Sequence, residues 1–175
     1  MRIYEKATDL IGRTALIRTG FNQNVFAKLE NLNPAGSAKD RVALNMIEQA
    51  EKRGDLKKGG LIIEATSGNT GIGLAMVSAV KGYRCLIIMP DTMSRERQNL
   101  IKAYGAEVLL TDGNLGMQGS IDKAEEIKKE NPGSVIMGQF VNQDNAMAHY
   151  KTTGREIWED LDGSKWYNDA KFVLG

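Results

Sequence analysis

Residues 61–75 read LIIEATSGNTGIGLA, and this stretch decides the fold. The apolar run at 61–63 lacks the alternation of a half-exposed strand, so it predicts a strand that is covered on both faces. A loop of small hydroxyl and amide residues follows, and a helix is expected from about residue 70 to 81, ending at Gly82. A strand that runs through a short polar loop into a helix is typical of the start of a βαβ unit.

The rest of the chain repeats this alternation on the C-terminal side and departs from it on the N-terminal side. Further short apolar runs occur at 85–89, 108–110 and 135–137. Helical patterns are expected after Ser37, with Asp40 as a capping residue, after Ser94, and over about 118–130 and 145–161. Strict alternation predicts an α/β fold with a parallel twisted sheet flanked by helices. The first 35 residues instead predict a hairpin.

Composition restricts the classes of partner and compartment. The 175 residues are 42% hydrophobic and carry a net charge of +1, which excludes a disordered chain and gives no field for nucleic acid or an anionic membrane. Cys85 is the single cysteine, so no internal disulfide is possible, and a reducing compartment is expected. No apolar run approaches the roughly 20 residues of a membrane span, and no secretory segment is visible. We expect a cytoplasmic protein with no metal site.

The segment NPAGSAKDR at 33–41 places Lys39 in the first turn of a predicted helix. The start of a helix carries partial positive charge, which favours a neutral amine over a cation. A neutral amine attacks carbonyl carbons, so the position suits a lysine that forms a Schiff base. The alternative is a solvated surface lysine, which position alone favours.

The loop at 64–73 is a candidate anion site. Free backbone N–H groups at a helix start bind anions, and the hydroxyls of Thr66, Ser67 and Thr70 would add donors for a carboxylate or phosphate. The glycine order G-x-x-G-x-G matches neither the dinucleotide fingerprint nor a P-loop, and a tight strand-to-helix turn is the alternative. Gln139 follows another predicted strand, so its amide could point into the same cleft.

Several segments in register resemble one family, the pyridoxal-phosphate enzymes that include cysteine synthase and cystathionine β-synthase. The matching stretches are NPAGSAKDR at 33–41, EATSGNTGIGLA at 64–75, MPDTMSRER at 89–97, AYGAEVLLT at 103–111 and AHYKTTGREIWED at 148–160. The resemblance implies the tryptophan-synthase β-like fold, known as fold type II, with a small α/β domain at 36–145. Residues 1–35 and 146–175 would then be parts of an incomplete larger cofactor domain, truncated before the family's phosphate loop.

The resemblance also implies roles for individual residues. Lys39 would be the catalytic lysine that binds the cofactor pyridoxal 5′-phosphate covalently, and Asn69 would hydrogen-bond that cofactor. The substrate would be bound by Thr66, Ser67, Gly68, Asn69, Thr70 and Gln139. The implied reaction is a β-replacement that makes L-cysteine from O-acetyl-L-serine and sulfide, in a homodimer that can bind the tail of a serine acetyltransferase.

A second hypothesis follows from the family's phosphate loop, which would lie beyond Gly175. A chain without that loop would be catalytically incompetent and would act at most as a module that binds an anion or a partner protein. The donor amino acid also stays open, because serine, cysteine and O-acetylserine are handled by the same motifs.

Overall fold

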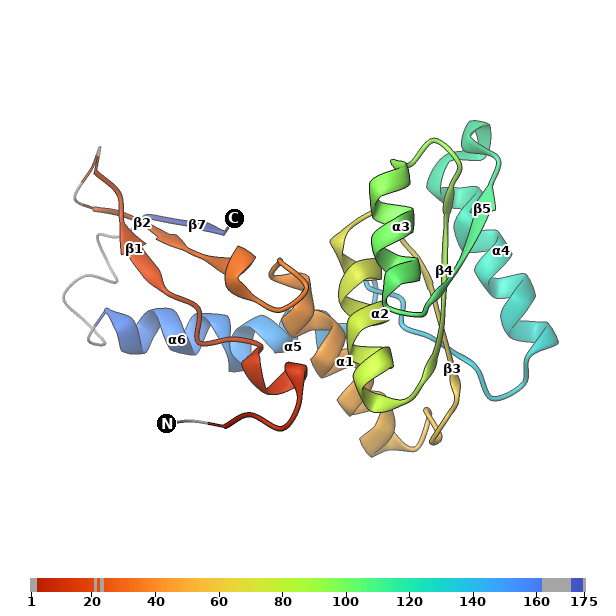
Figure 1. Cartoon of the computed structure of the whole chain (residues 1–175), viewed down its shortest axis with the longest axis horizontal. Coiled ribbons are helices and arrows are strands. Elements are labelled where there is room, and N and C mark those ends of the chain that lie inside the picture. Colours follow the sequence, from red (N-terminus) through yellow and green to blue (C-terminus); the bar gives the residue numbers. More distant parts are fainter. Residues whose placement is uncertain (1–2, 21, 23, 162–170, 175) are drawn as a thin grey trace.

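The computed structural model describes residues 3–20, 22, 24–161 and 171–174, and these form two sheets with helices around them (Figure 1). One sheet has the strand order β1-β2-β7 and the other β5-β4-β3-β6. The strands are β1 Leu16–Arg18, β2 Val25–Lys28, β3 Leu61–Ala65, β4 Arg84–Pro90, β5 Glu107–Thr111, β6 Val135–Ile136 and β7 Lys171–Leu174. The helices are α1 Lys39–Arg53, α2 Asn69–Lys81, α3 Arg95–Ala103, α4 Gly116–Glu130, α5 Gln143–Lys151 and α6 Thr153–Asp160, with short 3₁₀ turns at Ala7–Leu10, Glu30–Leu32 and Gly113–Leu115.

The four-stranded sheet confirms the predicted parallel arrangement. β3 lies between β4 and β6, and all three pairings in this sheet are parallel. Its two faces are covered by different helices, α2 and α3 on one side and α4 on the other (Figure 1). Ile62 and Ile87 pack in the core cluster with α1 and α2, whereas Ile63 and Ile88 pack against α4. Covering on both faces explains why these strands have continuous apolar sequences.

The smaller sheet contains the expected hairpin. β1 and β2 are antiparallel, with Leu16 opposite Lys28, and β7 pairs with β2 in parallel. Residues 162–170, which belong to the predicted 146–175 segment, lie outside the described residues. The single helix expected over 145–161 is wrong, because α5 and α6 are separate helices that meet at Thr152. The hydroxyl of Thr152 donates to the Ala148 carbonyl over 2.7 Å, the kind of local bond by which threonine bends helices.

The start of α1 differs slightly from the expectation. The N-cap position is Ala38 rather than Ser37, so Asp40 is not at the third helical position. Ser37 still serves the helix start, because its hydroxyl accepts the Lys39 N–H over 3.1 Å. Asp40 is fully buried and accepts the Ala35 N–H over 2.6 Å. These two bonds hold the preceding turn against the first turn of α1.

Helices α1 and α2 approach closely at Gly73. A Cβ atom on Gly73 would lie 3.0 Å from the Lys39 carbonyl oxygen and 3.3 Å from the Ala43 Cβ. The glycine therefore allows the first turn of α1 to lie against α2. It brings the backbone of Lys39 close to the helix that begins at Asn69.

Replacing Gly73 by alanine is expected to lower the free energy of unfolding by about 1–3 kcal/mol, because the added methyl group meets backbone atoms that cannot turn away. Urea denaturation followed by circular dichroism measures this change. Gly20→Ala is the matched control, since no atom lies within 4 Å of its added Cβ. A stabilised Gly73→Ala protein would contradict the prediction, because it would show that only the higher helix propensity of alanine matters.

A buried ionic network ties α1 to the smaller sheet and α6. The Arg41 guanidinium donates to Glu30 over 2.8 Å and to Glu156 over 2.6 Å, and Lys28 Nζ lies 3.0 Å from Glu156. Arg41, Glu30 and Lys28 are all buried. The network therefore joins segments that are far apart in the sequence and fixes the orientation of α1.

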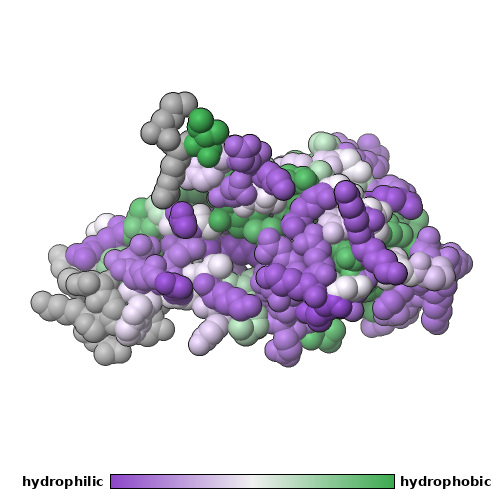
Figure 2. Space-filling view, turned by 90° about the horizontal axis from the view of Figure 1, so that it is seen from below, coloured by the Kyte–Doolittle hydropathy of each residue, from purple (hydrophilic) through white to green (hydrophobic). Residues whose placement is uncertain are grey.

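The distribution of polar and apolar side chains on the surface agrees with the ordinary amino-acid composition of the chain. Polar side chains dominate the face shown in Figure 2, with smaller apolar areas between them. Within the described ranges, no helix combines the length and the hydropathy needed to cross a bilayer.

Candidate functional site

Three polar side chains form a hydrogen-bonded group with Gln139 in the middle, which we call the clamp: Thr66, Thr70 and Gln139. The Thr70 hydroxyl donates to Gln139 Oε1 over 2.5 Å, and Gln139 Nε2 donates to Thr66 Oγ1 over 3.0 Å. Both threonines are buried, whereas Gln139 is partly exposed. The clamp therefore has one side open to solvent.

The fold explains why these residues meet. Thr66 directly follows β3, Thr70 lies in the first turn of α2, and Gln139 follows β6. β3 and β6 are parallel neighbours, so their carboxyl ends lie at the same edge of the sheet. The structure thus confirms that the Gln139 amide points toward the 64–73 loop.

The other residues predicted for the loop are nearby but have different surroundings. The Gly68 N–H lies 3.4 Å from Thr66 Oγ1, at the long end of hydrogen-bond distance. Ser67 is partly exposed and Asn69 is exposed. Within the part of the chain that the structure describes, neither side chain forms a hydrogen bond. Their polar groups are therefore available to a ligand.

Lys39 lies in the first turn of α1, as predicted, where it is the first helical residue, and it is half-buried. Its carbonyl oxygen lies close to Gly73, which is one helical turn beyond Asn69. Its Nζ forms no hydrogen bond with any described residue, so the amine is not joined to the clamp in this structure. The structure places the backbones of Lys39 and α2 together.

Glu64 is a functional candidate that the sequence reasoning missed. Its Oε2 accepts the Gly138 N–H over 2.7 Å, and its Oε1 accepts the Gln139 N–H over 3.2 Å. Burial raises the pKa of this carboxyl to about 7, although the two N–H donors act in the opposite direction. The signal was present in the sequence, since LIIEA places an acidic residue inside a strand expected to be covered on both faces.

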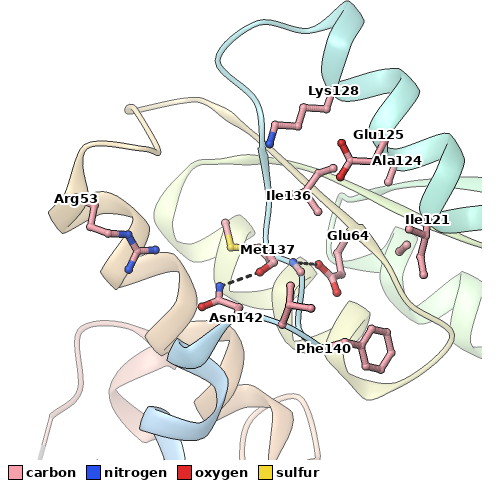
Figure 3. Close-up of a pocket in the computed structure, with 13 residues that line it drawn as sticks. Arg53, Glu64, Ile121, Ala124, Glu125, Lys128, Ile136, Met137, Phe140 and Asn142 are labelled. Atoms are coloured by element: carbon pink, nitrogen blue, oxygen red, sulfur yellow. Dashed lines mark hydrogen bonds between the residues drawn. The ribbon is translucent and has the colours of Figure 1, made fainter.

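A cavity of about 470 Å³ lies beside this carboxyl (Figure 3). Its walls come from β3, β6, α4, the end of α1 and the segment that follows β6. The lining residues are Arg53, Glu64, Ala65, Ile121, Ala124, Glu125, Lys128, Ile136, Met137, Gly138, Phe140, Val141 and Asn142. Glu64 therefore borders both the cavity and the turn that carries Gln139.

The surroundings of two other potentially reactive side chains, His149 and Cys85, are typical of residues with a structural role. His149 Nδ1 lies 3.0 Å from the Thr153 hydroxyl, and burial, with the nearby charges of Lys39 and Arg41, lowers its pKa. Cys85 is buried in β4, and burial raises the pKa of its thiol to about 12. Among the described residues, no group of three or more His, Cys, Asp or Glu side chains is arranged to hold a metal ion.

The comparisons with known proteins decide the family. A family model described as "Pyridoxal-phosphate dependent enzyme" matches residues 7–170. The chain belongs to this family. It is 53% identical to a probable cysteine synthase of Bacillus subtilis over 162 residues, which cover 90% of this chain and 52% of the relative.

Solved structures agree with this assignment. A cysteine synthase from Entamoeba histolytica has a TM-score of 0.88 at 48% identity, over 93% of this chain and 51% of that one. A hydrogen sulfide-producing enzyme from Fusobacterium nucleatum has a TM-score of 0.87 at 51% identity, over 92% of this chain and 55% of that one. The chain therefore has the fold of the cysteine synthase family, the tryptophan-synthase β-like fold, and spans about half the length of these relatives.

Proposed function

We propose that this chain supplies the reactive lysine and the substrate-carboxylate site of an enzyme that makes L-cysteine from O-acetyl-L-serine and sulfide by β-replacement. The observation that carries the proposal is the clamp at the start of α2, next to the helix that begins with Lys39. The similarity to cysteine synthases supports the same reaction.

The clamp is suited to a carboxylate. In the clamp, the Thr66 hydroxyl accepts from Gln139, so its own proton stays available for donation. Gln139 Nε2 has a second N–H, and the first N–H groups of α2 have no acceptor within the helix. A substrate carboxylate at this position would receive hydrogen bonds from neutral donors and favourable charge from the helix start.

The reactive part of pyridoxal phosphate fits the residues beside the clamp. Lys39 offers a primary amine for the aldehyde carbon, and Asn69 offers an unused side-chain amide for an oxygen on the ring. When bound, this cofactor stabilises the negative charge that is left when the substrate loses its α-proton. The clamp would hold the carboxylate in one orientation, and the Lys39 amine would accept the α-proton.

The domain division is part of the same proposal. Residues 36–145 would form a small domain around the four-stranded sheet, and residues 1–35 and 146–175 would contribute to a larger cofactor domain. The separate three-stranded sheet, built from β1, β2 and β7, supports this division. A homodimer and a serine acetyltransferase tail as partner stay predictions.

Trapping the cofactor tests the role of Lys39. The purified chain is incubated with pyridoxal phosphate and reduced with borohydride, and the adduct is located by peptide mass spectrometry. We expect Lys39 to be labelled in preference to exposed lysines such as Lys57 and Lys58. Labelling spread evenly over the surface lysines would contradict the proposal.

The alternative of a non-catalytic module that binds an anion or a partner protein stays a prediction. The two functions differ in their expected binding. A module of this kind would bind a carboxylate at the clamp without forming the Lys39 adduct, whereas the proposed enzyme component does both.

A further inference from the structure

We propose that Glu64 is a positioning residue that sets the orientation of Gln139 in the clamp, an inference that rests on the proposed function of the clamp as a carboxylate site. Glu64 lies in β3 and Thr66 directly follows that strand, and both residues contact Gln139. Thr66 binds the side chain of Gln139, and Glu64 binds its backbone. One short segment therefore holds Gln139 at both ends.

The contacts around Gln139 leave its orientation dependent on Glu64. Its N–H donates to Glu64 Oε1 over 3.2 Å, and its carbonyl oxygen accepts from Asn145 Nδ2 over 2.9 Å. The preceding residue, Gly138, donates to the other oxygen of Glu64 over 2.7 Å, the bond drawn at the centre of Figure 3. Gly138 has φ +62°, a backbone conformation that suits glycine and lets two successive N–H groups reach one carboxylate.

The electrostatic surroundings of Glu64 agree with a positioning role. The residue is 1% exposed, and it forms no ion pair with any described cation. The charge of the carboxylate is therefore compensated mainly by the two N–H donors. Such an arrangement lowers stability relative to a neutral side chain, so it is expected where geometry matters more than stability.

Other titratable groups face the same region. Cys85 on β4 lies close enough to interact with the Glu64 charge, and Arg53 of α1 and Glu125 and Lys128 of α4 line the same cavity (Figure 3). Arg53 is paired with Asp55 and Asp144, and the Glu125 and Lys128 side chains are exposed. Among these titratable groups, Glu64 is the buried carboxylic acid. The cavity beside it gives protons a route from solvent to the carboxyl.

Protonation of Glu64 should loosen the clamp. A neutral carboxyl has one O–H donor in place of an acceptor, so it no longer accepts both N–H groups well. Because the pKa of Glu64 is about 7, the carboxylate form dominates at pH 8 and the neutral form at pH 5.5. Carboxylate binding should therefore weaken as the pH falls through this range.

The test uses the Glu64→Gln variant of the chain, because the amide keeps the size of the side chain but has one acceptor instead of two. L-Serine is the probe, since its carboxylate and amino group keep their charges between pH 5.5 and 8. Binding is measured by NMR titration of the ¹⁵N-labelled chain. We expect the wild type to bind roughly tenfold more weakly at pH 5.5, and the variant to bind roughly tenfold more weakly at pH 8 with no further pH dependence. Glu125→Gln, at an exposed carboxyl of the same cavity, should behave like the wild type.

A second readout keeps the proposal separate from the function of the clamp. Without ligand, the Gln139 side-chain amide signals of the wild type should shift with an apparent pKa near 7, and in Glu64→Gln they should not shift. If L-serine does not bind the wild type but these signals titrate as expected, the carboxylate site is wrong and the positioning role stands. Gln139 signals that titrate identically in the two proteins, or binding that is unchanged in Glu64→Gln, would overturn the proposal.

Discussion

Replacing Arg41 by methionine is expected to lower the free energy of unfolding by about 3–5 kcal/mol, because it leaves two carboxylates without their main cation. Arg41 bonds Glu30, which is 0% exposed, and Glu156, whose side chain is 16% exposed. Methionine keeps much of the apolar volume, so the loss reflects the uncompensated charges more than a cavity. Urea denaturation at pH 7 measures the change.

The pH dependence of this loss separates charge from packing. Burial raises the pKa of Glu156, but the hydrogen bonds from Arg41, the Arg13 backbone and Lys28, together with the Arg41 charge, outweigh it and hold the pKa at about 2. A carboxyl with a lowered pKa contributes stability above its ordinary value near 4.5, and that contribution is lost as the pH falls toward 2. The difference between wild type and Arg41→Met should therefore shrink in acid. Arg155→Met, at an exposed pair with Glu159, is the control and should leave stability unchanged at both pH values.

A loss in Arg41→Met no larger than that in Arg155→Met would show that the buried network contributes nothing beyond an exposed pair. If Arg41→Met loses the same free energy of unfolding at pH 7 and in acid, the effect comes from packing instead of charge. The network matters for the site because Arg41 lies two residues after Lys39 in the same helix. Arg41 anchors α1 to the smaller sheet and α6, and α1 in turn sets the position of the lysine.

The parallel sheet was predictable because its signal is local. Strands covered on both faces need continuous apolar residues, and each of the runs at 61–63, 85–89, 108–110 and 135–137 lies in or overlaps a strand of that sheet. The break at Thr152 was not predictable in this way. The apolar pattern continues across α5 and α6, and the interruption depends on a hydroxyl that binds a carbonyl instead of solvent.

In the candidate site, too, some residues were predictable from the sequence pattern and one was not. Thr66, Thr70 and Gln139 were predictable, because parallel strands bring their carboxyl ends to one edge of the sheet. Glu64 was missed, because strand periodicity predicts that a residue is buried but does not show which backbone groups it meets. Its partners lie 74 and 75 residues further along the chain. Such pairs have no local pattern, so they appear only in the folded chain.

Replacing Lys39 by alanine should abolish the borohydride-trapped adduct at that site and leave the fold intact. The amine is the proposed point of attachment, so its removal eliminates the bond completely. The side chain is half-buried, and its amine forms no hydrogen bond with any described residue, so the free energy of unfolding should change by less than about 0.5 kcal/mol. Peptide mass spectrometry and urea denaturation measure the two effects separately.

Two matched variants show which property of Lys39 matters. Lys39→Arg keeps the positive charge but offers a guanidinium that stays protonated, so it should also lose the adduct. Lys57→Ala removes an exposed lysine and should leave trapping at Lys39 unchanged. Retained trapping in Lys39→Ala, at a neighbouring lysine with similar yield, would contradict the assigned role. If both Lys39 variants lose the trapped adduct but keep normal stability, then trapping requires a nucleophilic amine at this helix start. A positive charge alone does not replace that amine.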